Sequence, residues 1–191
     1  MTYKLKAFQE TAVSTLLDKF FFSKKDTIIF SSPTGSGKTI MMIELIKRII
    51  INNPRDYNYA FVWLTPGNGE LEEQSYKSAL RESNSIFVPQ LLMDVLSGGF
   101  QESSVTFINW EQVKGSKNNR AMKDGEVANL PDRIDEAHQA GVRFILIVDE
   151  EHRDNIVKAK EVIERFKSEK NVRVSATPQS NGDAYDNIQV N

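Results

Sequence analysis

The sequence contains no cysteine, which excludes disulfide bonds and thiolate metal sites. It has only two histidines, too few for a zinc site built on imidazole groups. No apolar run approaches the ~20 residues that a membrane helix needs. The first residues, Met1 to Lys6, also lack the apolar core of a signal peptide. We therefore expect a cytoplasmic protein that makes no contact with a membrane.

The chain also lacks a strong excess of charge of one sign. It has 24 Lys and Arg against 26 Asp and Glu, for a formal net charge of −2. This balance argues against a domain that grips nucleic acid by bulk electrostatics alone, although one face can still bind it. With 191 residues, 40% of them apolar and 26% charged, the sequence predicts one globular domain with a substantial core.

Short apolar segments bounded by turn residues alternate with helical patterns, which is typical of an α/β fold with a mostly parallel sheet covered by helices on both faces. The expected strands are 27–31, 59–65, 105–108, 144–148 and 171–175, and the expected helices are 6–22, 38–51, 70–81, 129–139 and 155–168. Residues 85–96 are expected to be irregular, and 114–129 to form a polar surface excursion.

This pattern predicts a single domain over residues 1–180. Residues 181–191 lack an apolar face, so we expect a polar tail that leads toward a second domain.

A glycine-rich turn lies between the first expected strand and the second expected helix. Backbone N–H groups in such a turn, together with the helix N-terminus, can surround phosphate oxygens. Ser32 stands where the pattern G-x-x-x-x-G-K-[ST] has its first glycine, but the rest of the pattern is present. Lys38 supplies a cation and Thr39 a hydroxyl for magnesium. The predicted phosphate-binding residues are Pro33, Thr34, Gly35, Ser36, Gly37, Lys38 and Thr39.

An acidic pair, Asp149 and Glu150, directly follows the apolar segment 144–148. Ligands bind beyond the carboxyl ends of buried parallel strands, so this pair is expected near the glycine-rich turn. Asp149 then serves as a second magnesium ligand, and Glu150 polarises the attacking water. Both halves together predict hydrolysis of ATP with magnesium.

A second acidic tetrapeptide, Asp135-Glu136-Ala137-His138, spells the better-known helicase motif DEAH, whereas 149–152 spells DEEH. Pro131 fits the first turn of a helix, and the polar residues up to Gln139 favour an amphipathic surface helix that ends at Gly141. We therefore interpret residues 135–138 as a solvated helix face and assign the chemistry to Asp149 and Glu150.

Taken in order, six segments resemble superfamily 2 helicases and translocases over nearly the whole chain: 5–9, 31–39, 64–66, 106–110, 149–152 and 175–178. The sequence is most similar to the ATPase motor of the Res subunit of type III restriction enzymes, because of Thr106-Phe107-Ile108-Asn109-Trp110 and a D-E-x-H-R stretch that ends at Arg153. The resemblance implies a RecA-like P-loop fold.

The resemblance also implies roles for single residues. Gln9 matches a glutamine that reads adenine, and an amide offers the donor and acceptor that this requires; the alternative is an exposed polar residue on the first helix. Ser175 and Thr177 match a motif that couples ATP to nucleic acid, and His152, assigned with Lys38 to catalysis, would reach toward it. The alternative for Ser175 and Thr177 is a simple turn at a strand end.

Contacts with a phosphodiester backbone are implied for six positions: Thr65, Pro66, Gly98, Gly99, Thr106 and Asn109. Hydroxyls, amides and exposed N–H groups give the sequence-independent grip that a translocating enzyme needs. Trp110 could stack on a base, but a core position is favoured.

Together these features predict the N-terminal motor domain of a DNA helicase or translocase, as in the restriction subunit of a type III enzyme. Expected partners are DNA, a second RecA-like domain of the same polypeptide and a modification (methyltransferase) subunit. Without that second domain, whose arginines stabilise the transferred phosphate, we expect slow hydrolysis. The alternatives are an RNA helicase of the same superfamily and an ATP-gated interaction module without motor activity.

Overall fold

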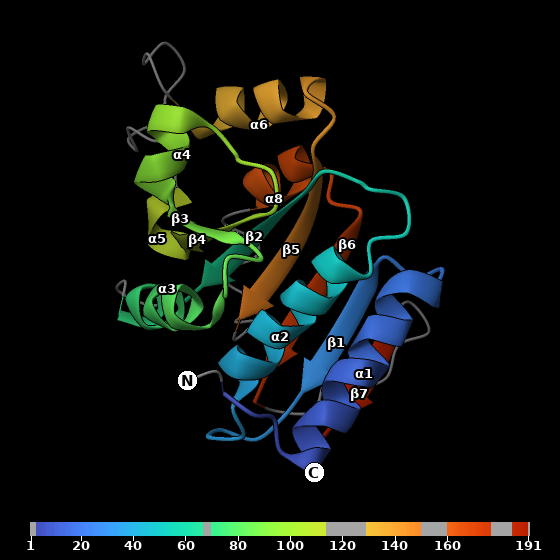
Figure 1. The fold of residues 1–191 in the computed structure, drawn as a ribbon. Coiled ribbons are helices and arrows are strands. Elements are labelled where there is room, and N and C mark those ends of the chain that lie inside the picture. Colours follow the sequence, from blue (N-terminus) through green and yellow to red (C-terminus); the bar gives the residue numbers. More distant parts are fainter. Residues whose placement is uncertain (1–2, 67–69, 114–128, 150–159, 177–184, 191) are drawn as a thin grey trace.

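The computed structural model describes residues 3–66, 70–113, 129–149, 160–176 and 185–190. Strands and helices alternate along the chain (Figure 1). The elements are α1 (Ala7–Phe22), β1 (Thr27–Ser31), α2 (Lys38–Ile51), β2 (Tyr59–Thr65), α3 (Glu70–Glu82), β3 (Val88–Leu91), α4 (Leu92–Gly98), β4 (Ser104–Asn109), α5 (Trp110–Val113), α6 (Leu130–Gln139), β5 (Arg143–Asp149), α8 (Lys160–Phe166), β6 (Lys170–Ser175) and β7 (Asp186–Gln189).

The strands form one seven-stranded sheet in the order β3-β4-β2-β5-β6-β1-β7. Every pairing in it is parallel, which confirms the predicted fold class. In a parallel sheet all strands end at the same edge, so the segments that follow β1, β5 and β6 are neighbours in space.

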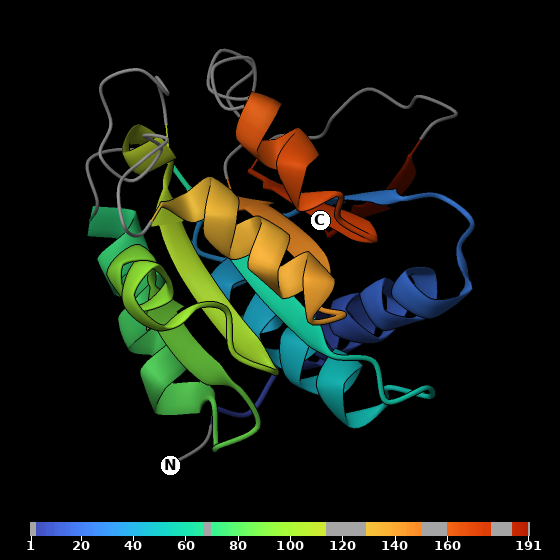
Figure 2. The same ribbon diagram turned by 90° about the horizontal axis from the view of Figure 1, so that it is seen from above.

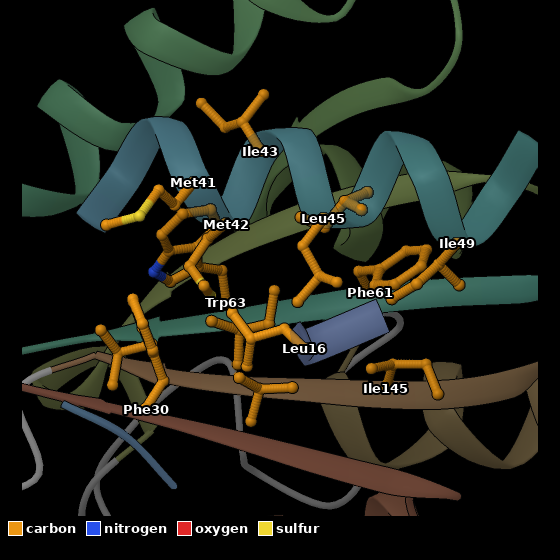
Figure 3. Packing of buried hydrophobic residues seen from close by; sticks show 14 of the residues in the cluster. Leu16, Phe30, Met41, Met42, Ile43, Leu45, Ile49, Phe61, Trp63 and Ile145 are labelled. Carbon is orange, nitrogen blue, oxygen red and sulfur yellow. The ribbon is translucent and has the colours of Figure 1, made fainter. Parts of the chain in front are cut away.

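Helices cover both faces of the sheet, as the sequence predicts (Figures 1 and 2). One core lies under α1, α2 and α3, and Figure 3 shows Leu16, Leu45 and Trp63 meeting there. The other lies under α4, α5, α6 and α8, with Ile134 and Phe166 fully buried in it. Burial on both faces explains why the central strands read as continuous apolar runs.

Two parts of the structure differ from the sequence-based expectation. Residues 85–96 are not irregular, because they contain β3 and most of α4. The tail is not simply a polar extension, because Asp186–Gln189 is strand β7, which pairs with β1. Asp186 lies close to two lysines, with Nζ–Oδ1 distances of 3.6 Å to Lys19 and 3.9 Å to Lys25. Strands β3 and β7 are only four residues long, and β7 is mostly polar, so the sequence shows no strand periodicity there and pairing with a neighbouring strand decides their structure.

The expected helix 155–168 is described from Lys160, and it ends earlier than predicted, at Phe166. Most of the expected excursion 114–129 lies outside the described residues. Within the described part of the chain, no helix combines the length and apolar character needed to cross a bilayer.

Candidate functional site

The carboxyl edge of the sheet brings together the residues that the sequence analysis selected. The register pairs Ser31 of β1 with Ser175 of β6, and Val174 of β6 with Asp149 of β5. Since neighbouring strands lie about 4.8 Å apart, β1 and β5 are separated by about 10 Å at this edge. The glycine-rich turn after β1 and the acidic end of β5 therefore face one region.

The turn 32–37 is held by a hydrogen bond to β6 and by hydrogen bonds within the turn itself. The Ser32 N–H donates to the Ser175 carbonyl at 3.0 Å, and the Ser36 N–H donates to the Pro33 carbonyl at 3.2 Å. The hydroxyl of Ser32, a residue only 2% exposed, donates to the Ser36 hydroxyl at 2.7 Å. Ser32 thus uses its side chain to bridge the turn, which accounts for a serine where the usual pattern has glycine.

Two glycines give the turn its shape. Gly35 and Gly37 have φ values of +79° and +89°, in the left-handed region that residues with a Cβ atom disfavour. Pro33, Thr34 and Gly35 are exposed, and no atom comes within 4 Å of a Cβ built on Gly35. The turn therefore presents an open rim of backbone where a phosphate can approach closely.

Helix α2 begins directly after this turn, and Gly37 at its N-cap gives no side-chain hydrogen bond. The first N–H groups and the positive end of the helix dipole are therefore available to an anion. The ammonium group of Lys38 lies beside the turn, with Nζ 3.2 Å from the Ser32 carbonyl oxygen and 3.5 Å from that of Pro33. Thr39, the next residue of α2, is half-buried.

Gln9 from α1 is fastened to the same turn. Its amide nitrogen donates to the Ser36 carbonyl at 2.8 Å, and its amide oxygen accepts from the Lys6 N–H at 2.9 Å. Gln9 is 2% exposed, so the alternative interpretation as an exposed polar residue is wrong. Its predicted role in reading adenine stays a prediction.

The contact between Gln9 and Gly37 leads to a first prediction. A Cβ on Gly37 would lie 2.6 Å from Gln9 Nε2, whereas Gly35 has the same type of φ and free space. Both Gly→Ala changes strain the backbone by about 1–2 kcal/mol. Gly37→Ala is expected to lower the free energy of unfolding by about 1 kcal/mol more, because the buried Gln9 amide must leave Ser36. Urea unfolding of both variants measures this difference.

Gly35→Ala is the matched control for strain without the contact. Repeating the comparison in a Gln9→Ala background should remove the additional cost of Gly37→Ala. If the additional cost persists without the Gln9 side chain, the contact is not its cause.

Asp149 is the acidic residue of the site that the structure describes. It is the last residue of β5 and is half-buried. Glu150, Glu151, His152 and Arg153 lie outside the described residues. Among the described residues, no group of three or more His, Asp or Glu side chains could hold a metal ion. One carboxylate and one hydroxyl, Asp149 and Thr39, fit magnesium, which takes few protein ligands and completes its shell with phosphate oxygens and water.

The second acidic tetrapeptide lies elsewhere, as predicted. Residues 135–138 belong to α6, whose N-cap Asn129 accepts from the Asp132 N–H at 2.8 Å. The His138 ring packs 5.2 Å from Phe144, near the amino end of β5. Phe144 and Asp149 are five residues apart in a strand, about 16 Å. Asp135 pairs with Arg165, which lowers the pKa of the Asp135 carboxyl.

A pair of isosteric changes tests this assignment in the full-length protein. Asp149→Asn is expected to reduce ATP turnover by a factor of about 100 or more, because the magnesium ion that offsets the phosphate charge loses its carboxylate ligand. Asp135→Asn should leave turnover unchanged and lower the free energy of unfolding by at most about 1 kcal/mol, since it breaks only an exposed ion pair. Loss of turnover in Asp135→Asn would contradict the assignment.

The residues predicted to contact a nucleic-acid backbone, or to couple it to ATP, are only partly brought together. Thr65, Asn109 and Ser175 end their strands at the carboxyl edge. The Asn109 side chain accepts from the Glu111 N–H at 2.8 Å and so caps the start of α5. Thr65 is fully buried and its hydroxyl has no hydrogen-bond partner. Pro66 is buried, and Thr177 lies outside the described residues.

Three of these positions do not lie at this edge. Thr106 is fully buried in the middle of β4, between Val62 and Gln90, and cannot reach a backbone from there. Gly98 and Gly99 lie on the return from β3 to β4, and the next residue, Phe100, packs 4.8 Å from Phe144. They therefore lie toward the amino ends of the strands, because α4 carries the chain back across the sheet.

Trp110 is 1% exposed and belongs to the second core, which confirms the favoured interpretation of this residue.

The structure adds one acidic residue that the sequence analysis missed. Glu72 of α3 is 7% exposed, and burial raises the pKa of its carboxyl, while a hydrogen bond with Gln112 lowers it. Gln112 in turn accepts from the Asn109 N–H at 3.0 Å. Glu72 lies among Glu70 and Glu73 in the first turn of α3, so nothing in the sequence separates it from its exposed neighbours.

An all-parallel sheet with a P-loop after β1 and an aspartate at the end of β5 is the arrangement of a RecA-like P-loop domain. The family model described as "Type III restriction enzyme, res subunit" matches residues 2–180, and the chain belongs to this family. It is thus a helicase-family ATPase motor domain of this type. No curated protein matches the sequence.

Two solved structures share the fold. One is a nuclease-deletion mutant of the Type ISP restriction-modification enzyme LlaGI in complex with a DNA substrate mimic, with a TM-score of 0.62 and 17% identity over 94% of this chain. The other is the Sulfolobus solfataricus SWI2/SNF2 ATPase core in complex with dsDNA, with a TM-score of 0.63 and 12% identity over 93% of this chain. This chain spans 18% of the first neighbour and 33% of the second.

Proposed function

We propose that this chain is the first motor domain of an ATP-driven DNA translocase or helicase, and specifically of the restriction subunit of a type III restriction-modification enzyme. The observation that carries the proposal is the meeting of the phosphate-binding turn and Asp149 at one edge of the sheet. Membership of the family supports the finer assignment.

Each residue has a proposed task in ATP hydrolysis. Backbone N–H groups within residues 34–39 and the Lys38 ammonium hold the phosphates, and Thr39 and Asp149 hold the magnesium ion, which offsets phosphate charge. Glu150 polarises the attacking water. Gln9 orients the turn through Ser36 and is proposed to contact adenine. His152, Ser175 and Thr177 are proposed to pass the state of the phosphates on to the nucleic acid.

DNA is the proposed track, and the carboxyl ends of β2 and β4, at Thr65, Pro66 and Asn109, are the proposed place of contact. Both structural neighbours were solved with DNA or a DNA mimic. The net charge of −2 favours a grip by amides, hydroxyls and helix ends over a broad basic surface. A second RecA-like domain of the same polypeptide is the further proposed partner, and both neighbours are several times longer than this chain. We further propose a methyltransferase subunit as a partner and the cytoplasm as the location of the enzyme.

The test is ATP turnover by the full-length enzyme with length-matched duplex DNA or duplex RNA. We expect stimulation by DNA and little or none by RNA. Stimulation by RNA alone would establish the RNA helicase instead. If neither nucleic acid changes the rate of ATP turnover, the result would favour an ATP-gated interaction module.

A further inference from the structure

A pocket of about 410 Å³ opens at the amino edge of the sheet, on the side opposite the phosphate-binding turn. Tyr59, Arg143 and Lys170 begin β2, β5 and β6, and all three line it. The seven residues of β5 span about 20 Å, so the pocket and Asp149 are separated by about that distance. None of the residues assigned to the ATP site lines this pocket.

Four aromatic rings form the apolar part of the pocket: Phe20, Phe21, Tyr57 and Tyr59. Ring centroids lie 5.1 Å apart for Phe20 and Phe21 and 5.8 Å apart for Tyr57 and Tyr59, both in edge-to-face contact. This packing fixes the rings in place, so the pocket offers preformed aromatic walls. Tyr59 is 4% exposed, and burial raises the pKa of its phenol to about 12.

Two guanidinium groups share the ring of Tyr57. Arg143 lies over the ring, 3.4 Å from its centroid, and Arg55 donates to the Tyr57 hydroxyl at 2.7 Å. The Arg55 cation lowers the pKa of the Tyr57 phenol through this hydrogen bond. One tyrosine thus holds two positive charges side by side, which costs free energy unless negative charge is near.

The chain supplies less negative than positive charge here. Glu169 pairs with Arg143 at 3.1 Å, and the other carboxylate lining the pocket is Asp26. Against these stand Arg55, Arg143 and Lys170. The Lys170 ammonium donates to the backbone carbonyls of Ser23 and Lys25. These acceptors are uncharged, so they do not neutralise the positive charge of Lys170.

We propose that this pocket is a second ligand site, separate from the ATP site, that takes a small aromatic anion. The ring of the ligand packs against the aromatic walls, and its phosphate or carboxylate accepts from Arg55 and Arg143, which present planar N–H groups suited to such anions. A cavity of this size, lined by aromatic rings and by convergent charged groups, lies within the size range of small-molecule sites.

The test uses the 191-residue chain carrying Lys38→Ala, so that the P-loop does not compete for anions. Phenyl phosphate, benzoate and inorganic phosphate are titrated separately, and the arginine side-chain NMR signals are followed. We expect saturable shifts at Arg55 and Arg143 with both aromatic anions, and at least about ten-fold weaker binding of inorganic phosphate. The two aromatic probes distinguish a phosphate from a carboxylate ligand.

Arg55→Gln should weaken binding of the preferred aromatic anion by about ten-fold or more, and it leaves folding intact because Arg55 is exposed. Arg173→Gln is the matched control, since Arg173 lies near another tyrosine, Tyr185, outside the pocket. Equal affinity for phenyl phosphate and inorganic phosphate, or unchanged affinity in Arg55→Gln, would overturn the proposal. Neither result bears on ATP turnover, so the proposed motor function stands or falls separately.

Discussion

Replacing Lys38 by Ala is expected to abolish the thermal stabilisation that magnesium and ATP give to the wild-type chain. The Lys38 ammonium lies 3.2 Å from the Ser32 carbonyl, beside the turn that surrounds the phosphates. Its removal leaves several negative charges without their cation. A ligand at 100 times its Kd adds about 2.7 kcal/mol to the free energy of unfolding. For a chain of this size that raises Tm by about 5–10 °C, and we expect this increase to disappear.

The measurement is a thermal shift assay with and without magnesium and ATP. Lys77→Ala is the matched control, because Lys77 is an exposed lysine of α3 that pairs with Glu73 on its own helix. The control should keep the full shift. A Lys38→Ala variant that retains a wild-type shift would show that ATP binds without this cation and would contradict the assigned site.

Glu150→Gln is expected to lower ATP turnover of the full-length enzyme by a factor of about 10²–10⁴ while ATP binding is kept. Glu150 follows Asp149, the last residue of β5, in the chain. A carboxylate can accept a proton from the attacking water, whereas an amide of the same shape cannot. The change removes one negative charge from the residue that follows Asp149, so affinity for ATP is expected to stay the same or to rise.

Turnover and binding are measured separately, by phosphate release with DNA present and by equilibrium titration with labelled ATP. Glu161→Gln, a change of an exposed residue in α8, serves as the control with wild-type turnover. If Glu150→Gln retains turnover, another group activates the water. If it loses ATP binding instead, Glu150 is a binding residue, and the proposed division of labour with Asp149 is wrong.

The long central strands could be predicted because burial on both faces leaves an unmistakable apolar run. Residues 59–65 and 27–31 were expected with the bounds that the structure shows. The same logic separated the two acidic tetrapeptides, since only residues 149–152 follow such a run. Proline and asparagine near residue 130 then predicted α6 from its capping chemistry.

Other features depend on contacts between distant residues and have no local signal. Strand β7 exists because Asp186–Gln189 lies beside β1, although Ile188 is its only apolar residue. The contact of Gln9 with Ser36 joins two segments whose approach only the packing of α1 on the sheet decides. Likewise, Thr106 resembles a backbone contact in sequence but lies inside the sheet, because its hydroxyl falls mid-strand.

The order of strands in the sheet has a consequence for how the protein is made. Strand β1 is synthesised early, yet its neighbours in the sheet are β6 and β7. Thr27 therefore cannot pair with Asn171, nor Ser31 with Gln189, until those later residues have been synthesised. At ribosomal rates this delay is roughly 10–30 seconds. During that time the apolar strand that carries the P-loop has no partner in the sheet and is open to chaperones or to aggregation. The ATP site is therefore among the last parts of this domain to assemble.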